Sequence, residues 1–400
     1  MGIPDRIIAN LNANVEDVRV TRNARFMDQK VTPDVISFLA ECILALEPAL
    51  QLHFTKNDIW RLPYFVENVQ TIFGKPSPEE KSASHEYDKF TAQPIKALSY
   101  AGLLQETRAG NANYYSVNDR LSLEFVAISP QRALEFLQSY LEIVLQKSGL
   151  FSRFSNYFNS PQSQSDYDVL RTEFIDFMIG NTAINTEVEV RRIFPKVLNP
   201  LAVAKRAHGA QKGRVSKQIF LQSDLLYNQT NFRDIGKAKS KTRQMHAVVA
   251  PPRSADALQN YLTKKAMDAI KRRHAPLSEM TGELSQGEAT QVHHIFPRSH
   301  RPELVDVLEN LILLTPSQHF TLAHPGNRTG SVSLEYQTRC LMAKSVAIRM
   351  SNVMGDGFYA AEKLRDVIRV GFVLDESSET WDLDDIDSFL EARLVSVQGK

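Results

Sequence analysis

The 400-residue sequence predicts an α+β fold that is mostly helical. Most of the chain carries apolar residues at the three- and four-residue spacing of amphipathic helices. Two regions, 103–117 and 290–314, instead carry the β-branched, aromatic and turn residues that are typical of short paired strands. The 43% hydrophobic content is enough to bury a sizeable core, and the length suggests two or three domains.

The N-terminal third is predicted to contain helices followed by a hairpin. No element is predicted over residues 1–30, and an amphipathic helix is predicted over 33–50. A short apolar segment, 58–66, precedes a polar loop at 75–84. Helical spacing resumes over 87–104, and two strand-like pieces then flank a turn at 109–111.

This order of elements resembles a winged helix. The resemblance implies that the helix around 93–99 is a DNA-recognition helix and that 108–115 is the wing. Its candidate DNA contacts are Lys89, Gln93 and Lys96. Winged helices also serve as structural or protein-contacting modules, and Pro94 inside the presumed recognition helix weighs against this assignment.

The middle of the chain is predicted to lead through helices to a basic stretch. Helices are predicted over 131–147 and 167–178, separated by a polar loop at 155–165 and followed by a mixed segment at 185–198. The formal net charge is only +1, but residues 196–243 hold eleven Lys or Arg against two acids.

Gly209 and Gly213 disfavour a helix in the basic stretch, so we predict an extended, mobile arm there. A DNA duplex carries one negative charge per ~1.7 Å, so such an arm can clamp the phosphate backbone. A solvated charged surface is the alternative. The candidate DNA contacts are Lys205, Arg206, Lys212, Arg214, Lys237, Lys239, Lys241 and Arg243.

The C-terminal third is predicted to be helical around a short histidine-rich segment. A basic helix over 254–274 is expected to pack beside that segment and to present Lys or Arg to phosphate. Helices over 333–350 and 358–370 are separated by a break at 355–357. The last thirty residues are acidic, and three interpretations stay open: a DNA mimic, a solvated surface, or a contact with the basic stretch.

Five of the ten histidines fall within 32 residues, from His293 to His324. The local pattern predicts a strand at 290–296, a loop, a strand at 311–314 and a helix. That helix starts with Thr315 as N-cap, Pro316 as first residue and Gln318 closing a capping box. Because neighbouring residues of a strand point to opposite faces, His293 can bind a metal while His294 faces a substrate.

The segment resembles the HNH, or ββα-metal, nucleases, and in spacing the nuclease colicins. The resemblance rests on the His-His-Ile-x-Pro run from His293, the Asn-Leu pair at Asn310 and the helical His319. It implies that His293 and His319 are metal ligands, that His294 is the general base, and that Asn310 fixes the loop. Asn310 is also open as a metal ligand. A histidine-rich loop without metal, or a degenerate DNA-binding remnant, is the alternative.

The role of His324 stays open. The colicin-like pattern has a third ligand four residues after the helical His, where this chain has Ala323. Five residues turn a regular helix by about 140°, so His319 and His324 would not face one ion. Pro325 disfavours helical backbone at His324 and can re-aim it.

The resemblance implies one divalent ion per site, Mg²⁺ or Mn²⁺, and imidazole ligands also suit Co²⁺ or Ni²⁺. Arg298 and His300 can contact the scissile phosphate or the groove, or be loop surface. Activity is expected to fall as the pH drops through the histidine range. Cys42 and Cys340 are the only cysteines, so we expect no disulfide framework and no Cys-ligated structural zinc.

We therefore expect a sequence-selective, restriction-type DNA endonuclease that cuts double-stranded DNA as a homodimer on a palindrome. The alternatives are a modification-dependent HNH nuclease, a nuclease toxin and a non-catalytic winged-helix regulator. No apolar run long enough for a membrane span and no signal peptide are visible, so we expect a cytoplasmic protein. The predicted parts are a winged-helix-like module (1–130), a helical connection (131–200), a basic arm (201–253), the HNH core (254–330) and C-terminal helices with an acidic tail (331–400).

Overall fold

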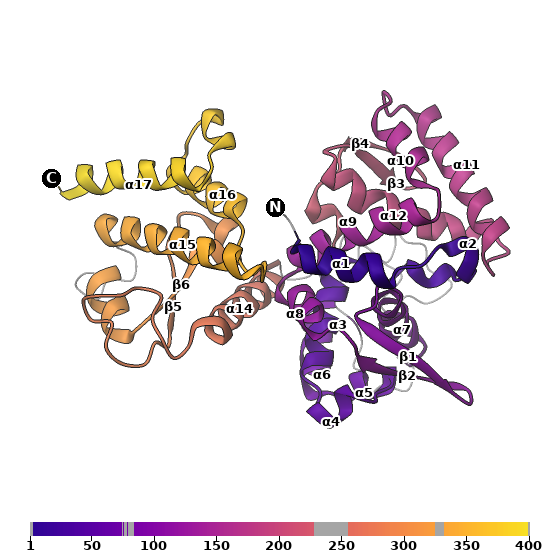
Figure 1. Cartoon of the computed structure of the whole chain (residues 1–400), viewed down its shortest axis with the longest axis horizontal. Coiled ribbons are helices and arrows are strands. Elements are labelled where there is room, and N and C mark those ends of the chain that lie inside the picture. The colour runs from indigo at the N-terminus through magenta and orange to yellow at the C-terminus, as the bar shows by residue number, and fades with distance from the viewer. Residues whose placement is uncertain are drawn as a thin grey trace, which may run out of the picture. The chain divides into compact units, whose positions relative to one another are not determined.

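The computed structural model describes residues 3–73, 75, 78, 84–227, 255–324 and 332–398. Its fold is α+β and mostly helical, and the described residues form three two-stranded antiparallel sheets. The chain divides into two compact units (Figure 1). One is Asp5–Ser254, and the other is Ala255–Lys400 together with the first four residues. The predicted five-part division stays a prediction.

The first unit is built around a buried helix. Its helices are α1 (Asp5–Asn14), α2 (Val18–Thr21), α3 (Pro33–Leu44), α4 (Pro48–Gln51), α5 (Lys56–Trp60), α6 (Pro63–Phe73), α7 (Ser84–Tyr100), α8 (Arg120–Ile128), α9 (Pro130–Lys147), α10 (Phe151–Phe158), α11 (Gln164–Asn181) and α12 (Glu187–Ala204). Helix α3 packs against α7, α8 and α9, and ten of its twelve residues are buried. It ends at Leu44, short of the predicted 50, and Pro48 starts the separate helix α4.

The predicted hairpin is confirmed. Strand β1 (Leu104–Ala109) pairs with β2 (Ala112–Val117) around the two-residue turn Gly110–Asn111. Gly110 has a φ of +61°, a backbone conformation that glycine adopts without steric cost. A single residue from before α5, Phe54, bridges to Tyr115 on β2.

The prediction of an extended, mobile basic arm is wrong for its described part. Strand β3 (His208–Gln211) pairs with β4 (Arg214–Ile219), and β3 packs on α12 while β4 packs on α11. Gly209 permits this close packing, because a Cβ there would lie 2.7 Å from Asn199 Oδ1 and 2.8 Å from Phe220 Cδ2. Asn199 also exchanges two hydrogen bonds with the backbone of Ala210. Four of the basic candidates, Lys237, Lys239, Lys241 and Arg243, lie outside the described residues.

The second unit places helices around a short hairpin. Its elements are α14 (Ala255–His274), β5 (Gln291–His294), β6 (Leu311–Leu314), α15 (Leu334–Met354), α16 (Ala361–Phe372) and α17 (Leu383–Gln398), with a π-helical turn at Gln318–Ala323. Helix α14 packs against both strands, as predicted. Gly355 ends α15 with a φ of +64°, at the predicted break.

The predicted acidic tail is largely a helix. Helix α17 packs on α15, and its Asp384 and Asp387 both bind Arg349 of α15, at 2.6 and 2.7 Å. These two acids therefore pair within their own unit. In the part of the chain that the structure describes, no helix has the length and apolarity needed to span a membrane.

Candidate metal centre

The hairpin β5–β6 supplies the base of the candidate site. His293 lies opposite Ile312 and His294 opposite Leu311 in the antiparallel register. All four residues of β6 are buried, so this strand is part of the apolar core. The alternation along β5 points the two imidazoles to different sides, as the sequence predicted.

Three histidines lie close together at this hairpin. One nitrogen from each of His293, His319 and His324 lies within 4.8 Å of the other two. The ring centroids form a nearly equilateral triangle, with distances of 5.3 Å from His293 to His319, 5.0 Å from His293 to His324 and 4.9 Å from His319 to His324. His293 and His324 are buried, and His319 is half-buried.

A π-helical turn brings His324 into the triangle. The backbone N–H of His324 donates to the carbonyl of His319 at 3.2 Å, a bond across five residues. This spacing closes one π-helical turn, whereas it overshoots an α-helical turn by about 140°. His324 itself has φ −121° and ψ 76°, outside the α region, as expected for a residue before proline. The five-residue spacing is thus compatible with His319 and His324 binding the same ion.

The polar atoms of the triangle suit a divalent cation. His319 Nδ1 is buried and has no hydrogen-bond partner in the described part of the structure. Burial, with the neighbouring His319, His324 and His294, lowers the pKa of His293 to about 3. Metal binding requires neutral imidazoles, and this environment keeps His293 neutral. Three imidazoles without a carboxylate form a donor set that transition ions prefer.

His294 lies next to the triangle in a defined orientation. Its Nε2 lies 3.1 Å from the carbonyl of Val305, so the ring donates there and Nδ1 carries the lone pair. Burial lowers the pKa of His294, the hydrogen bond to Val305 opposes this, and the positive charge of Arg298 adds to the lowering. A neutral imidazole with a fixed tautomer can accept a proton at Nδ1.

Asn310 braces the loop between the two strands. Its Oδ1 accepts from the backbone N–H of Phe296 at 2.8 Å, and its Nδ2 donates to the carbonyls of Phe296 and Leu304 at 3.1 and 3.0 Å. The side chain is completely buried. Leu304 precedes Val305, so the same brace positions the carbonyl that orients His294.

Arg298 and His300 lie on the exposed part of this loop. Arg298 Nη1 donates to Asn260 Oδ1 of α14 at 2.8 Å. Its positive charge contributes to the lowered pKa of His294. His300 is exposed and has no side-chain partner in the residues that the structure describes.

The remaining candidate DNA contacts that the structure describes belong to the first unit, and three of them have partners within that unit. Gln93 Oε1 accepts from the backbone N–H of Lys30 at 3.0 Å, which argues against a role in base recognition. Lys96 lies 3.9 Å from Glu106, and Lys205 lies 3.3 Å from Glu142. The other four are exposed: Lys89, Arg206, Lys212 and Arg214.

Sequence reasoning missed three residues that support β6 and the start of the π turn. They are Ser278, Glu279 and Lys344. One signal was present for Lys344, because it stands between Cys340 and Ile348 on the apolar face of a helix. A charge at such a position needs a buried partner.

Comparison of this chain with protein-family models, curated proteins and solved structures finds no match.

Proposed function

We propose that this protein is a metal-dependent DNA endonuclease of the HNH type. The observation that carries the proposal is the placement of His294, with a fixed tautomer, beside the triangle of His293, His319 and His324. The order of strand, braced loop, strand and helical turn supports it, since it follows the ββα-metal pattern that the sequence resembles.

His293, His319 and His324 would hold the metal ion. A divalent cation bound there stabilises negative charge on a phosphodiester and on its leaving oxygen. The all-imidazole donor set favours Mn²⁺, Co²⁺, Ni²⁺ or Zn²⁺ over Mg²⁺, which prefers oxygen ligands.

His294 acts as the general base in this proposal. Its Nδ1 takes a proton from a water molecule as the water oxygen attacks phosphorus, and the bond from phosphorus to the 3′ oxygen breaks. The leaving oxygen takes its proton from solvent. The Val305 carbonyl accepts a hydrogen bond from Nε2 throughout and stabilises the imidazolium that forms. Arg298, exposed on the loop that follows β5, offers a positive charge for a phosphate.

The first unit is the proposed DNA-recognition module. The run α3, Phe54, α5, α6, α7 and the β1–β2 hairpin has the order of a winged helix, and the bridge from Phe54 to Tyr115 corresponds to its third strand. The exposed Lys212 and Arg214 at the β3–β4 turn offer phosphate contacts. These features fit a sequence-selective, restriction-type nuclease of double-stranded DNA. A chain with one such site would need to act as a homodimer to cut both strands. The same features also fit a non-catalytic DNA-binding regulator.

Plasmid cleavage by wild type and by His294→Ala distinguishes these functions. With Mn²⁺, Co²⁺, Ni²⁺ or Mg²⁺ we expect wild type to cut and EDTA to abolish cutting. General bases typically contribute about 10²–10⁴-fold to a rate, so the variant should lose at least a hundredfold. Its metal affinity should stay close to that of wild type, because His294 is not part of the triangle.

The control is Glu391→Gln, which changes an exposed residue of α17 outside the triangle and outside the proposed recognition module. Sequencing of the cut ends reports whether cleavage occurs at one short motif. Cleavage by His294→Ala at the wild-type rate would refute the general-base role. DNA binding without any cleavage, on modified or unmodified DNA and with every metal, would favour the regulator.

A further inference from the structure

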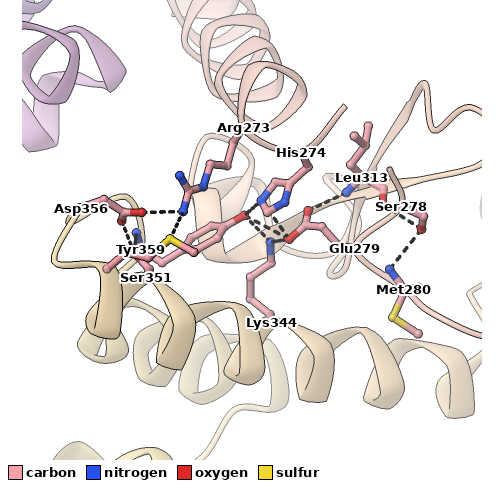
Figure 2. Close-up of polar contacts among 11 residues, drawn as sticks. Arg273, His274, Ser278, Glu279, Met280, Leu313, Lys344, Ser351, Asp356 and Tyr359 are labelled. Atoms are coloured by element: carbon pink, nitrogen blue, oxygen red, sulfur yellow. Dashed lines mark hydrogen bonds and ion pairs between the residues drawn. The ribbon is translucent and has the colours of Figure 1, made fainter. Parts of the chain in front are cut away.

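The second unit contains a buried polar network that the proposed chemistry does not use. Lys344 of α15 and Glu279 form an ion pair with Nζ and Oε2 2.5 Å apart, and their side chains are 0% and 3% exposed. Tyr359 and His274 complete the group (Figure 2). Tyr359 accepts from Lys344 at 2.8 Å and donates to Glu279 at 3.1 Å, and His274 Nε2 lies 2.7 Å from its hydroxyl.

Stability alone does not account for this network. Removing two charges from water is costly, and replacing a buried ion pair with apolar residues is often neutral or stabilising. Burial indeed lowers the pKa of Lys344, and the carboxylate of Glu279 opposes that effect. A buried pair of this kind can hold two segments in one geometry, and here Glu279 connects Lys344 of α15 to Leu313 of β6.

Glu279 holds the outer edge of β6. Its backbone N–H donates to the carbonyl of Leu313 at 3.0 Å, and its Oε1 accepts from the N–H of Leu313 at 2.8 Å. Figure 2 shows Glu279 between Lys344 on one side and Leu313 on the other. The ion pair therefore fixes segment 278–280 against the strand that precedes the π turn.

The same segment and Glu283 form hydrogen bonds with Gln318, the residue immediately before His319. Ser278 Oγ donates to Gln318 Oε1 at 2.6 Å, and Gln318 Nε2 donates to the carbonyls of Met280 and Glu283 at 3.0 and 3.3 Å. Gln318 Oε1 also accepts from the N–H of Thr315 at 3.2 Å, and Thr315 Oγ1 accepts from the N–H of Gln318 at 3.1 Å. The predicted capping box is thus confirmed, and the buried amide has its hydrogen-bonding capacity filled.

We propose that Lys344, Glu279 and Gln318 are positioning residues that fix the start of the π turn and thereby set the affinity and coordination geometry of the histidine triangle. None of the three belongs to the triangle. This inference rests on the metal site of the proposed function. It does not depend on the chain cleaving DNA.

Co²⁺ titration of the full-length protein tests the proposal, with absorption in the visible range as the readout of coordination geometry. Gln318→Met removes the amide at similar length, and Ser278→Ala removes one of its partners. The double variant Lys344→Met with Glu279→Gln removes both charges without leaving one unpaired. The matched control is Arg349→Met, which removes a cation from the same helix but breaks only the surface pairs with Asp384 and Asp387.

Residues that orient metal ligands typically contribute about 10–100-fold to affinity. We expect Gln318→Met and the double variant to weaken Co²⁺ binding in that range and to change the spectrum. Ser278→Ala should give a smaller loss, and Arg349→Met none. Each variant is titrated at a temperature at which circular dichroism shows it folded, and Ser278→Ala keeps the test open if a more severe variant unfolds.

Two results would overturn the proposal, and they differ in meaning. Variants that unfold at lower temperature but keep the wild-type Co²⁺ affinity and spectrum would make the network structural only. Wild-type protein that binds no Co²⁺ would remove the metal site itself, and with it the proposed function. Wild-type binding with no cleavage activity would leave the positioning role standing and refute only the nuclease.

Discussion

His294 and Asn310 illustrate what the sequence reveals about single residues. The resemblance of the histidine segment to the HNH nucleases implied a metal ligand beside a general base, and a loop-fixing amide. The structure places Asn310 in three loop hydrogen bonds. Sequence reasoning could not identify the carbonyl that orients His294, because Val305 lies eleven residues away in an irregular loop. Partners of that kind depend on how the loop folds.

The environment of His274 predicts a pH dependence of stability that is separate from the proposed metal site. Burial lowers the pKa of His274 to about 4. The negative charges of Glu279 and Asp356 oppose this lowering, and the positive charges of Lys344 and Arg273 add to it. The unfolded value is near 6.5, so between pH 6.5 and 4 the unfolded state binds more protons than the folded state. The stability therefore falls as the pH falls through this window, by at most about 3 kcal/mol from this residue.

Urea unfolding at several pH values between 7.5 and 4.5 measures this effect. Trp381 reports on the second unit once Trp60 of the first unit is replaced by Phe. In the same background, His274→Gln keeps a donor toward Tyr359 but cannot be protonated, so its stability should fall less steeply below pH 6.5. Parallel curves for the two proteins would contradict the assignment.

The π turn at Gln318–Ala323 shows the limit of prediction for elements. Spacing correctly predicted a helix start at Thr315 and left His324 unresolved, because a regular helix sets His319 and His324 about 140° apart. A π turn is favourable only when tertiary contacts hold it, and here they come from segment 278–283, some 35 residues earlier. The same limit applies to the basic hairpin, where Gly209 indicated mobility and instead permits close packing.

Changing the length of the π turn tests its role. Deletion of the exposed Thr321 leaves His319 and His324 four residues apart, which is about 40° on an α-helix and still one face. We expect this variant to bind Co²⁺ within about tenfold of wild type. Insertion of one Ala after Thr321 separates the histidines by about 240° and should abolish tight binding. Equal affinities for the deletion and the insertion would show that His324 is not a ligand.

At the scale of the whole molecule, composition and periodicity predicted a mostly helical α+β fold, and the structure confirms it. The chain divides at Ser254 and Ala255, after the basic stretch whose second half lies outside the described residues. All four histidines of the candidate site and the three proposed positioning residues, Lys344, Glu279 and Gln318, belong to one unit. The proposed recognition surfaces belong to the other.

This separation predicts that the two activities can be divided. A fragment of residues 255–400 should fold and bind Co²⁺ within a few-fold of the full chain, because the contacts of the site lie within it. Its DNA affinity should be weaker and should depend less steeply on salt, since fewer phosphates are contacted. Titration with Co²⁺ and DNA-binding assays at several salt concentrations measure both. A folded fragment with the DNA affinity of the full chain would place recognition in the second unit.

The π turn also bears on how such a site can change over evolutionary time. A single inserted residue between two helical ligands would ordinarily destroy a metal site at once. A turn that takes up the extra residue as a wider loop of backbone returns the second imidazole to its place, so such an insertion is compatible with the site. The site is then defined by where its nitrogen atoms lie in space, and the number of residues between two ligands can differ by one.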